Sequence, residues 1–593
     1  MTAMSAPDRN KQMAEAEALL GDRLSQVGFA KGLYFGQYLR PRLGEYPDRD
    51  ANPATRQMVT ALQDFCQREI DPVAIDRNAK IPDSVVRGLG ELSVLGACLP
   101  VDCGGRAMSQ SSYCQLVEQL GGHCGSTALF VNAHHSIGPR AIVLFGTPEQ
   151  KQRWLPKLAS GEWLSAFALT EPEAGSDAAN VQTTATPTPD GSGYKLNGEK
   201  RWITNGGIAQ VLTVMARTPV EGSDETRITA FLVTPDMPGF EVVEARMEKC
   251  GVRGTATSRL RFTDMFVPRE NVLGKLGGGL RVALTVLDFG RTTFGASCTG
   301  AAKFCVEQTA RHANRRVQFG QTLGSFELVK EKLAYMTAGA FAMESVTYQT
   351  AALIDAGEGD YMIETAMLKV FSTEVLWRII NDSFQIHGGM AYFTDQPFER
   401  MMRDARINTI GEGANDVLRA FIALVGMRDV GLELKGIFDA LFHPWGNLGR
   451  ITGFAGRKLS SLLVSPKIEV RHEELSRDAT RLGRVVGELG GDVARLLARH
   501  REAIVDRQYQ LARVADAATE LYVSACVLNR LDHLLDKPAD VNGDAARSDA
   551  LAAGRYYLRT ADRRIRHALY QLSHHDDEDT TKLADDLLKR SSP

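Results

Sequence analysis

One carboxylate stands between two glycines in the segment INTIGEGANDVLRAF: Glu412, with Gly411 before it and Gly413 after it. Glycine reaches backbone conformations that other residues avoid, so this pair brings the main chain close to another group or presents the acid at an unusual angle. Glu412 is therefore a candidate functional acid. The alternative is helix capping, because Asn415 and Asp416 favour a helix start directly afterwards. Capping accounts for those two residues and leaves Glu412 unexplained.

Two segments carry groups suited to a flat or anionic ligand. In FALTEPEAGSDAAN, a predicted strand ending at Thr170 turns through Gly175 and Ser176, which exposes backbone N–H groups and hydroxyls. In KRWITNGG, Trp202 and Thr204 are two residues apart and share one face of a predicted strand, an apolar wall beside a hydroxyl. An ordinary β-turn and a tryptophan buried in the core are the alternatives for these two segments.

Two further segments are typical of contacts with a phosphate or a backbone. NRRVQFG places Arg315 and Arg316 before an aromatic residue, which suits a phosphate and an adjacent ring. An exposed helical charge pair is the alternative. Paired glycines in QIHGGMAY indicate a close approach of the main chain. LGGGLRV opens a helix without the βαβ setting of a dinucleotide fold, so we interpret it as a turn.

Metal and serine-hydrolase chemistry find no support in the sequence. His134 and His135 are adjacent and cannot share a helix face, and no other histidine has a partner at ligand spacing. There is no G-x-S-x-G segment, so a serine hydrolase is not expected.

The elements that must position these groups change character along the chain. Residues 53–164 follow a helical pattern after an N-terminal extension, 1–52. Residues 165–275 form short runs of β-branched and aromatic residues separated by Gly, Pro, Asp and Asn, which predicts a compact β domain. Helical patterns return over 276–430 and continue in a second block, 431–593.

The composition describes an ordinary globular protein. The chain has 593 residues, 44% hydrophobic and 24% charged residues and a net charge of −3, so we expect two to four packed units and no nucleic-acid partner. Its nine cysteines include no C-x-x-C pair, which favours a reducing compartment. The amino end matches neither a signal nor a transit peptide, and no apolar run is long enough to span a membrane. The expected location is cytoplasmic.

In combination, these segments resemble the acyl-CoA dehydrogenase family. The similarity runs from FAKGLYFGQYLRPRLGEYP through LFGTPEQKQRWLPKLASGEW, FALTEPEAGSDAA, LNGEKRWITNGG, NRRVQFG and QIHGGM to EGANDVLRAFIAL. It is closest to the very-long-chain branch, whose members carry an additional C-terminal helical domain. The implied fold is mainly α with a central β domain: a helical N-domain, a β-barrel-like middle domain, a four-helix-bundle C-domain and the extra helical domain.

The resemblance implies FAD as cofactor and a set of residues that hold it. Positions similar to those that line the flavin ring are Phe167, Leu169, Thr170, Ser176, Trp202 and Thr204. Positions similar to those that hold the pyrophosphate and adenosine of a neighbouring subunit's flavin are Arg316, Gln318, Phe319, Gln385 and Gly389, which implies a homodimer. Ala414, where the family usually has threonine, and Asp416 also match cofactor-binding positions.

The implied reaction is α,β-dehydrogenation of a fatty acyl-CoA to a trans-2-enoyl-CoA in fatty-acid β-oxidation. Glu412 matches the base that removes the α-proton, and hydride passes to flavin N5. Residues that match substrate-binding positions are Ser176, Asp288, Arg291 and Gly413. Electron-transfer flavoprotein is the implied acceptor, with an oxidase using dioxygen as a weaker possibility. A catalytically idle assembly protein on the same fold is the alternative function, and acyl length is left open.

The segment 441–464 contains no acidic residue and mixes Arg450, Arg457 and Lys458 with apolar residues. It predicts a peripheral contact with a membrane surface, which would be the inner face for a cytoplasmic protein. A helix packed on the catalytic core is the alternative.

Overall fold

The computed structural model describes residues 27–442, 465–537 and 543–591. It divides into two compact units. The larger unit contains residues 47–414, and the smaller unit combines residues 27–46 with the described residues from 415 onwards. The domain limits expected from the sequence stay a prediction.

The larger unit begins with a helical layer. Its elements are α4 (Pro53–Glu69), α5 (Pro72–Asn78), α6 (Asp83–Glu91), η2 (Val101–Cys103), α7 (Gln110–His123), α8 (Gly125–Val131), η3 (Asn132–Ile137), α9 (Gly138–Phe145) and α10 (Pro148–Ser160). A capping box between Thr147 and Gln150 starts α10. The Gln150 amide then donates to the carbonyls of Glu270 and Val272, at 2.7 and 2.9 Å, and ties α10 to the neighbouring sheet.

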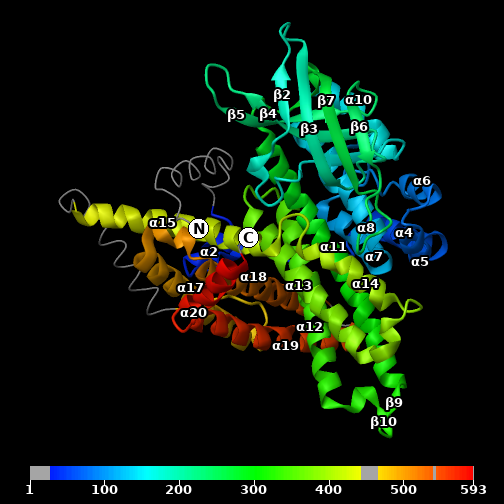
Figure 1. Cartoon of the computed structure of the whole chain (residues 1–593). Coiled ribbons are helices and arrows are strands. Elements are labelled where there is room, and N and C mark those ends of the chain that lie inside the picture. The colour runs from blue at the N-terminus through cyan, green and yellow to red at the C-terminus, as the bar shows by residue number, and fades with distance from the viewer. Residues whose placement is uncertain (1–26, 443–464, 538–542, 592–593) are drawn as a thin grey trace. The chain divides into compact units, whose positions relative to one another are not determined.

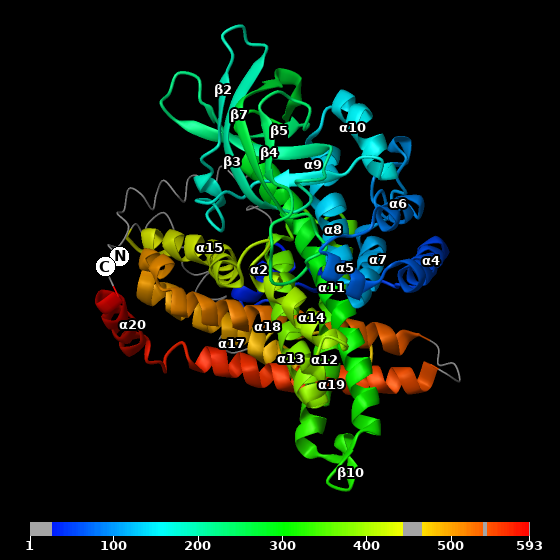
Figure 2. The ribbon, with the colours of Figure 1, turned by 45° about the vertical axis from the view of Figure 1, so that its right-hand side comes forward.

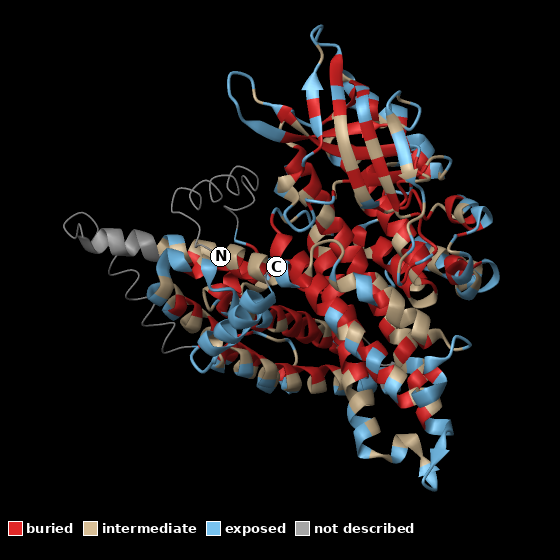
Figure 3. Cartoon of the chain, viewed as in Figure 1, coloured by how far each residue is buried: buried red, intermediate tan, exposed pale blue. Residues whose placement is uncertain are grey.

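That sheet has eight strands: β1 (Ser165–Ala168), β2 (Thr184–Pro187), β3 (Gly193–Ile203), β4 (Val211–Pro219), β5 (Thr226–Val233), β6 (Phe240–Glu244), β7 (Ser258–Pro268) and β8 (Val272–Leu273). Their order is β6-β7-β3-β2-β4-β5-β8, and β1 pairs in parallel with β4. Two buried clusters cover β4 and β5, one on each face, because successive side chains of a strand point to opposite sides. The sheet interior is accordingly buried (Figure 3).

Three long helices follow: α11 (Gly279–Arg315), α12 (Glu327–Asp355) and α13 (Met362–His387). They pack against one another, and both views show them side by side (Figures 1 and 2). The short hairpin of β9 (Val317–Gln318) and β10 (Gln321–Thr322) lies at the end of α11 away from the sheet. Then come η7 (Gly388–Tyr392), α14 (Pro397–Arg406) and η8 (Ile407–Thr409), which lead to the Glu412 segment.

The smaller unit is helical. It contains α2 (Phe29–Tyr34), α3 (Arg40–Leu43), α15 (Asn415–Phe442), η9 (Glu473–Leu475), α17 (Ser476–His500), η10 (Arg501–Asp506), α18 (Gln508–Asp536), α19 (Gly543–Tyr570) and α20 (Asp577–Ser591). The Tyr34 hydroxyl donates to the Ile422 carbonyl at 2.9 Å, and Tyr34 packs on Gly426 of α15. The predicted fold class, helical domains around a central β domain with an extra C-terminal helical domain, is confirmed.

The predicted membrane-contacting segment, 441–464, lies outside the described residues except for its first two positions. Among the described helices, none combines the length and the apolar character that crossing a bilayer requires.

Candidate active site

The two glycines around Glu412 accompany an unusual backbone. Glu412 has φ +56° and Gly413 has φ +99°, both in the left-handed region. Glycine adopts this conformation freely, whereas for other L-residues it costs about 1 kcal/mol or more. The preceding turn is closed by Ile407, whose carbonyl accepts from the N–H groups of Ile410 and Gly411 at 2.9 and 2.8 Å. The surrounding structure therefore holds Glu412 in a conformation that its own preferences oppose.

Two cations from neighbouring helices hold this loop. Lys369 of α13 is fully buried, and its Nζ donates to the Gly413 carbonyl at 2.6 Å. Arg291 of α11 places its Nε 3.5 Å from the Glu412 carbonyl. Arg291 is itself fixed by Asp288, at 3.2 Å, and Asp288 also accepts from the Thr365 hydroxyl at 3.0 Å. The loop thus sits at the meeting point of α11 and α13.

The two oxygens of the Glu412 carboxylate have different surroundings. Oε1 accepts a hydrogen bond from Asn132 Nδ2 at 2.9 Å. Oε2 is buried and has no hydrogen-bond partner among the described residues, although Glu412 as a whole keeps some accessible surface. A Cβ atom on Gly290 of α11 would lie 2.7 Å from Oε2, so the carboxylate occupies space that only glycine leaves open. Buried carboxylate oxygens are normally paired, so an unpaired one indicates a reactive position.

Burial sets the proton affinity of this acid. It raises the pKa of Glu412 to about 7, against the opposing effects of Arg291, Lys369 and the Asn132 hydrogen bond. Burial also lowers the pKa of Lys369 to about 8, while Glu412 acts in the opposite direction. A carboxylate whose pKa lies near neutrality is suited to accept and release a proton under physiological conditions.

The structure brings most of the expected flavin-ring positions together. Phe167 lies in β1 and Trp202 in β3, and the N–H of Arg201 donates to the Thr170 carbonyl at 3.0 Å, which joins the two segments. Buried Lys200 also donates to the Leu169 carbonyl at 3.0 Å. Ser176 is exposed on the turn that follows.

Trp202 is an unusual residue in this group. Its φ is +60° and its side chain is 51% exposed, although tryptophan seldom adopts a left-handed backbone and is usually buried. Thr204 is half-buried two residues later. An exposed indole held in a strained backbone, beside a hydroxyl and strand-end carbonyls, is a surface suited to a planar ring.

The second group of expected cofactor positions lies far from Glu412. Arg316 directly follows the end of α11, and the helix rise puts it about 37 Å along the axis from Arg291. Gln385 lies about 24 Å along α13 from Lys369. The rings of His312 and His387 stack at 4.2 Å and connect these two helix ends. All five predicted residues of this group are exposed: Arg316, Gln318, Phe319, Gln385 and Gly389.

The expected substrate positions are divided. Asp288, Arg291 and Gly413 meet at the Glu412 loop, whereas Ser176 belongs to the sheet turn. Ala414 ends the larger unit, and Asp416 lies in the first turn of α15 in the smaller one. At Gly411 an added Cβ would meet the Ile407 carbonyl oxygen at 3.6 Å, an ordinary van der Waals contact, so a side chain at this position would not clash.

Sequence reasoning missed Gly290 and Lys369, which contact the Glu412 loop. It named Asn132 only as a position near which relatives with a deep pocket carry glycine, and not as a contact of Glu412. A lysine within the apolar run AMLKVFST was a usable signal, since a buried cation needs a partner. Gly290 carried no comparable signal. His134 is structural: Nδ1 accepts from the Ser165 N–H at 3.1 Å and Nε2 pairs with the Leu158 carbonyl at 3.1 Å. The described residues contain no cluster of three or more potential metal ligands.

Four family models match the chain. They are the N-terminal domain of acyl-CoA dehydrogenase over residues 52–162, the middle domain over 166–265, the C-terminal domain over 277–426, and the ACAD9/ACADV C-terminal domain over 473–592.

Individual proteins are similar over comparable lengths. The mitochondrial very long-chain specific acyl-CoA dehydrogenase of Homo sapiens is 38% identical over 523 residues, which cover 86% of this chain and 79% of the relative. An acyl-CoA dehydrogenase of Bacillus anthracis, solved in complex with FAD, has a TM-score of 0.77 and 28% identity and covers 93% of this chain and 91% of that chain. A chain from a structure described as the electron transferring flavoprotein of Acidaminococcus fermentans has a TM-score of 0.60 and 33% identity, covering 65% of this chain and 99% of that chain.

Proposed function

The chain belongs to the acyl-CoA dehydrogenase family, and on that premise we propose that Glu412 is the base of its reaction. The protein is an enzyme that dehydrogenates an acyl-CoA, and we propose that it converts a fatty acyl-CoA to the trans-2-enoyl-CoA in β-oxidation. The observation that carries this proposal is Oε2 of Glu412, which is buried and has no hydrogen-bond partner within the described ranges of the chain. It stands on a loop with a left-handed backbone that Lys369 holds through a hydrogen bond to the Gly413 carbonyl.

FAD is the cofactor of this family, and the residues present fit it. The exposed indole of Trp202, next to Thr204 and the Thr170 strand end, offers the flat surface that a flavin ring requires. Phe167, Leu169 and Ser176 would complete the ring contacts. A bound FAD supplies the two-electron acceptor for the hydrogen of the β-carbon.

The protein's own groups act on the α-carbon. Oε2 of Glu412 accepts the α-proton, because it is the carboxylate oxygen without a hydrogen-bond partner in the part of the chain that the structure describes. An α C–H of a thioester is weakly acidic, so negative charge that develops on the thioester must be stabilised in place. The main-chain N–H of Glu412 is offered to the thioester oxygen, and Arg291 and Lys369 add positive potential. Burial keeps water away from the carboxylate and raises the pKa of Glu412 to about 7, which is close to neutral pH.

The proposed function is tested by anaerobic mixing of the FAD-loaded protein with saturated straight-chain acyl-CoA thioesters. Visible flavin absorbance should bleach within the mixing time for at least one chain length, and the enoyl-CoA product should form in equal amount. An FAD-loaded protein that binds acyl-CoA and never bleaches would contradict the proposal. That result would favour the idle assembly protein.

We also propose a homodimer in which each subunit contributes to its neighbour's flavin site. The support is the distance between Arg316 and the Glu412 loop, together with the exposure of Arg316, Gln318, Phe319, Gln385 and Gly389. A group about 37 Å away along a helix cannot contact the flavin ring beside its own Glu412, and it remains free for a second subunit.

Changing Arg316 to alanine (Arg316→Ala) should therefore weaken flavin retention and dimerisation together, because a charged phosphate contact is lost at the subunit boundary. FAD content by absorbance and molecular mass by light scattering are the measurements. Arg311→Ala is the matched control, since it removes the same charge from the exposed surface of α11 about one turn before Arg315. A variant of Arg316 that stays a fully flavinated dimer would rule out this role.

The electron acceptor is proposed to be an electron-transfer flavoprotein, as the family relationship and the similar chain from Acidaminococcus fermentans suggest. A cytoplasmic location and a membrane contact through residues 441–464 stay predictions.

A further inference from the structure

Val252 has a backbone conformation that its residue type opposes. Its φ is +45°, in the left-handed region, although the residue is β-branched and buried at 6% exposure. For a β-branched residue this conformation is a genuine outlier, so neighbouring groups must hold it. Val252 lies in residues 245–257, which join β6 to β7 and are called the connecting loop below.

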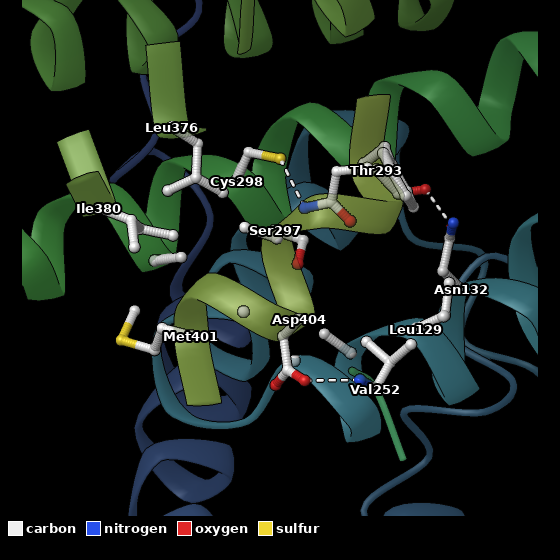
Figure 4. A pocket seen from close by; sticks show the side chains of 17 residues that line it. Leu129, Asn132, Val252, Thr293, Ser297, Cys298, Leu376, Ile380, Met401 and Asp404 are labelled. Atoms are coloured by element: carbon white, nitrogen blue, oxygen red, sulfur yellow. Dashed lines mark hydrogen bonds between the residues drawn. The ribbon is translucent and has the colours of Figure 1, made fainter. Parts of the chain in front are cut away.

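A carboxylate on α14 holds this strained residue. Oδ1 of Asp404 accepts the Val252 N–H at 2.5 Å, and Figure 4 shows this hydrogen bond. Burial raises the pKa of Asp404 to about 6, against the opposing effects of the Val252 hydrogen bond and of Arg400. The carboxylate is therefore ionised at neutral pH. Its hydrogen bond is charge-assisted, which makes the bond roughly twice as strong as a neutral one.

The preceding residue of α14 holds the same loop. Arg403 Nη1 donates to the Cys250 carbonyl at 3.1 Å, while Asp76 and Glu399 fix the guanidinium, both at 2.8 Å. Between the two held loop positions, a Cβ atom on Gly251 would lie 2.2 Å from the Arg403 carbonyl group. The connecting loop and α14 thus contact each other backbone to backbone, in a way that only glycine permits.

The residues at both ends of the connecting loop pack on the segment that follows Trp202. Ser258 pairs with Ile203 in the sheet, and its hydroxyl donates to the Ile203 carbonyl at 3.1 Å. At the other end, a Cβ atom on Gly207 would lie 2.5 Å from the Ala245 carbonyl oxygen. The loop is therefore fixed to the strand that presents the exposed indole.

The pairing of that strand makes the indole sensitive to the position of β7. β3 and β7 pair Lys200 with Leu260 and then Ile203 with Ser258, so β3 uses one residue more than β7 between these pairs. Such a β-bulge redirects a side chain, and Trp202 lies inside it. The direction of the indole therefore depends on where the start of β7 is held.

In the other direction, α14 leads to the proposed base. After its end, η8 and the turn closed by Ile407 continue directly to Glu412. The connecting loop thus joins, through Asp404 and its neighbour, the strand that carries Trp202 and the loop that carries Glu412. Trp202, Val252 and Glu412 all have a left-handed backbone. The structure therefore holds unfavourable conformations at both parts of the site and at the link between them.

We propose that Asp404 is a positioning residue: by holding Val252, it fixes the connecting loop between β3 and α14 and so sets the spacing between the indole of Trp202 and the carboxylate of Glu412. The two hydrogens leave neighbouring carbons of one substrate, so the base and the flavin-ring surface must be held at one distance. The inference rests on the proposed function, because it assumes that Glu412 is the base and that Trp202 faces the flavin ring.

Changing Asp404 to alanine (Asp404→Ala) removes the acceptor and leaves the strain of Val252 uncompensated. The limiting rate of flavin bleaching, and kcat with it, should fall about 100-fold, since a displacement of about 1 Å between reacting groups is enough for a loss of this size. KM for the acyl-CoA and the FAD content should stay at the wild-type values, because the contact that is lost orients the reacting groups and does not bind substrate or cofactor.

Glycine at position 252 tests the mechanism by rescue. Glycine adopts a φ of +45° without strain, so the connecting loop should keep its path when the carboxylate is absent. The double variant Asp404→Ala/Val252→Gly should therefore regain about ten-fold of the lost rate, which corresponds to the strain that is relieved.

Thr255→Val is the matched control for stability. The Thr255 hydroxyl donates to the Val252 carbonyl at 2.9 Å within the connecting loop, and its removal leaves the contacts with α14 in place. The melting temperature should fall as it does in Asp404→Ala, while kcat should stay at the wild-type value. Equal losses of kcat in the two variants would mean that Asp404 only stabilises the fold, and would overturn the inference.

Asp404→Asn is the second route, should the alanine variant fold poorly. It keeps the shape and an acceptor oxygen but loses the charge, so kcat should fall by a smaller factor, about five-fold, at unchanged KM. A wild-type kcat in both Asp404 variants, or a double variant no faster than Asp404→Ala, overturns the inference and leaves the proposed function standing. FAD-loaded wild-type protein that binds acyl-CoA and never bleaches overturns the proposed function, and the inference with it.

Discussion

Changing Glu412 to glutamine (Glu412→Gln) should leave FAD and acyl-CoA bound and remove turnover by about 10⁴-fold. Glutamine keeps the shape of the side chain and the main-chain N–H, but it cannot accept the α-proton. Loss of a general base costs about 10² to 10⁴ in rate, and the upper end is expected because no other carboxylate lies beside Oε2 among the contacts of the described residues.

Anaerobic mixing with a saturated acyl-CoA is the decisive measurement. Wild-type protein should bleach its flavin at once, and Glu412→Gln should not. Glu331→Gln, the same change on the exposed surface of α12, should behave as wild type. Bleaching of Glu412→Gln at the wild-type rate would mean that another residue is the base, and that the left-handed backbone at Glu412 serves another purpose.

Changing Gly290 to alanine (Gly290→Ala) should lower kcat by about 100-fold without unfolding the protein. The added methyl group would lie 2.7 Å from Oε2, so the carboxylate must move. A displacement of about 1 Å at a reacting atom is enough for a loss of this size. Alanine is a better helix former than glycine by about 0.5–1 kcal/mol, so the thermal stability of α11 should not fall by a comparable amount.

Gly295→Ala provides the control for this prediction. It adds the same methyl group to the same helix, where it meets the flexible side chain of Leu368 at 2.8 Å and does not contact Glu412. Steady-state kinetics and the melting temperature of both variants separate a displaced carboxylate from general damage to α11. Equal kcat values for Gly290→Ala and Gly295→Ala would exclude the steric role of Gly290.

The single-chain structure also gives physical support to the dimer proposal. Positions such as Arg316 and Gln385 resemble flavin contacts, yet they are exposed at helix ends far from the Glu412 loop. An extended cofactor that used both groups of residues within one subunit would have to bridge about 37 Å of helix. Contribution to a neighbouring subunit is the simpler arrangement, and Arg316→Ala tests it.

The sequence by itself determined the element types, the family resemblance and the position of the candidate base. Helical and β periodicity distinguished the helical regions from the β region, because the spacing of apolar residues within a short segment depends on whether that segment is a helix or a strand. The Gly-Glu-Gly segment identified Glu412 for a similar reason. Glycine is typical of a left-handed backbone, and Glu412 and Gly413 both adopt that conformation.

Only the tertiary structure decided what surrounds that base. Asn132 lies 280 positions from Glu412 in the chain, and Lys369 and Gly290 belong to two different helices. Which side chains meet depends on how far each helix is rotated and how its ridges pack on its neighbours, and local sequence patterns do not encode that choice. The tertiary structure also decides the pKa of Glu412. Burial by elements distant in the sequence raises that pKa to about 7, and the residue type alone does not predict this.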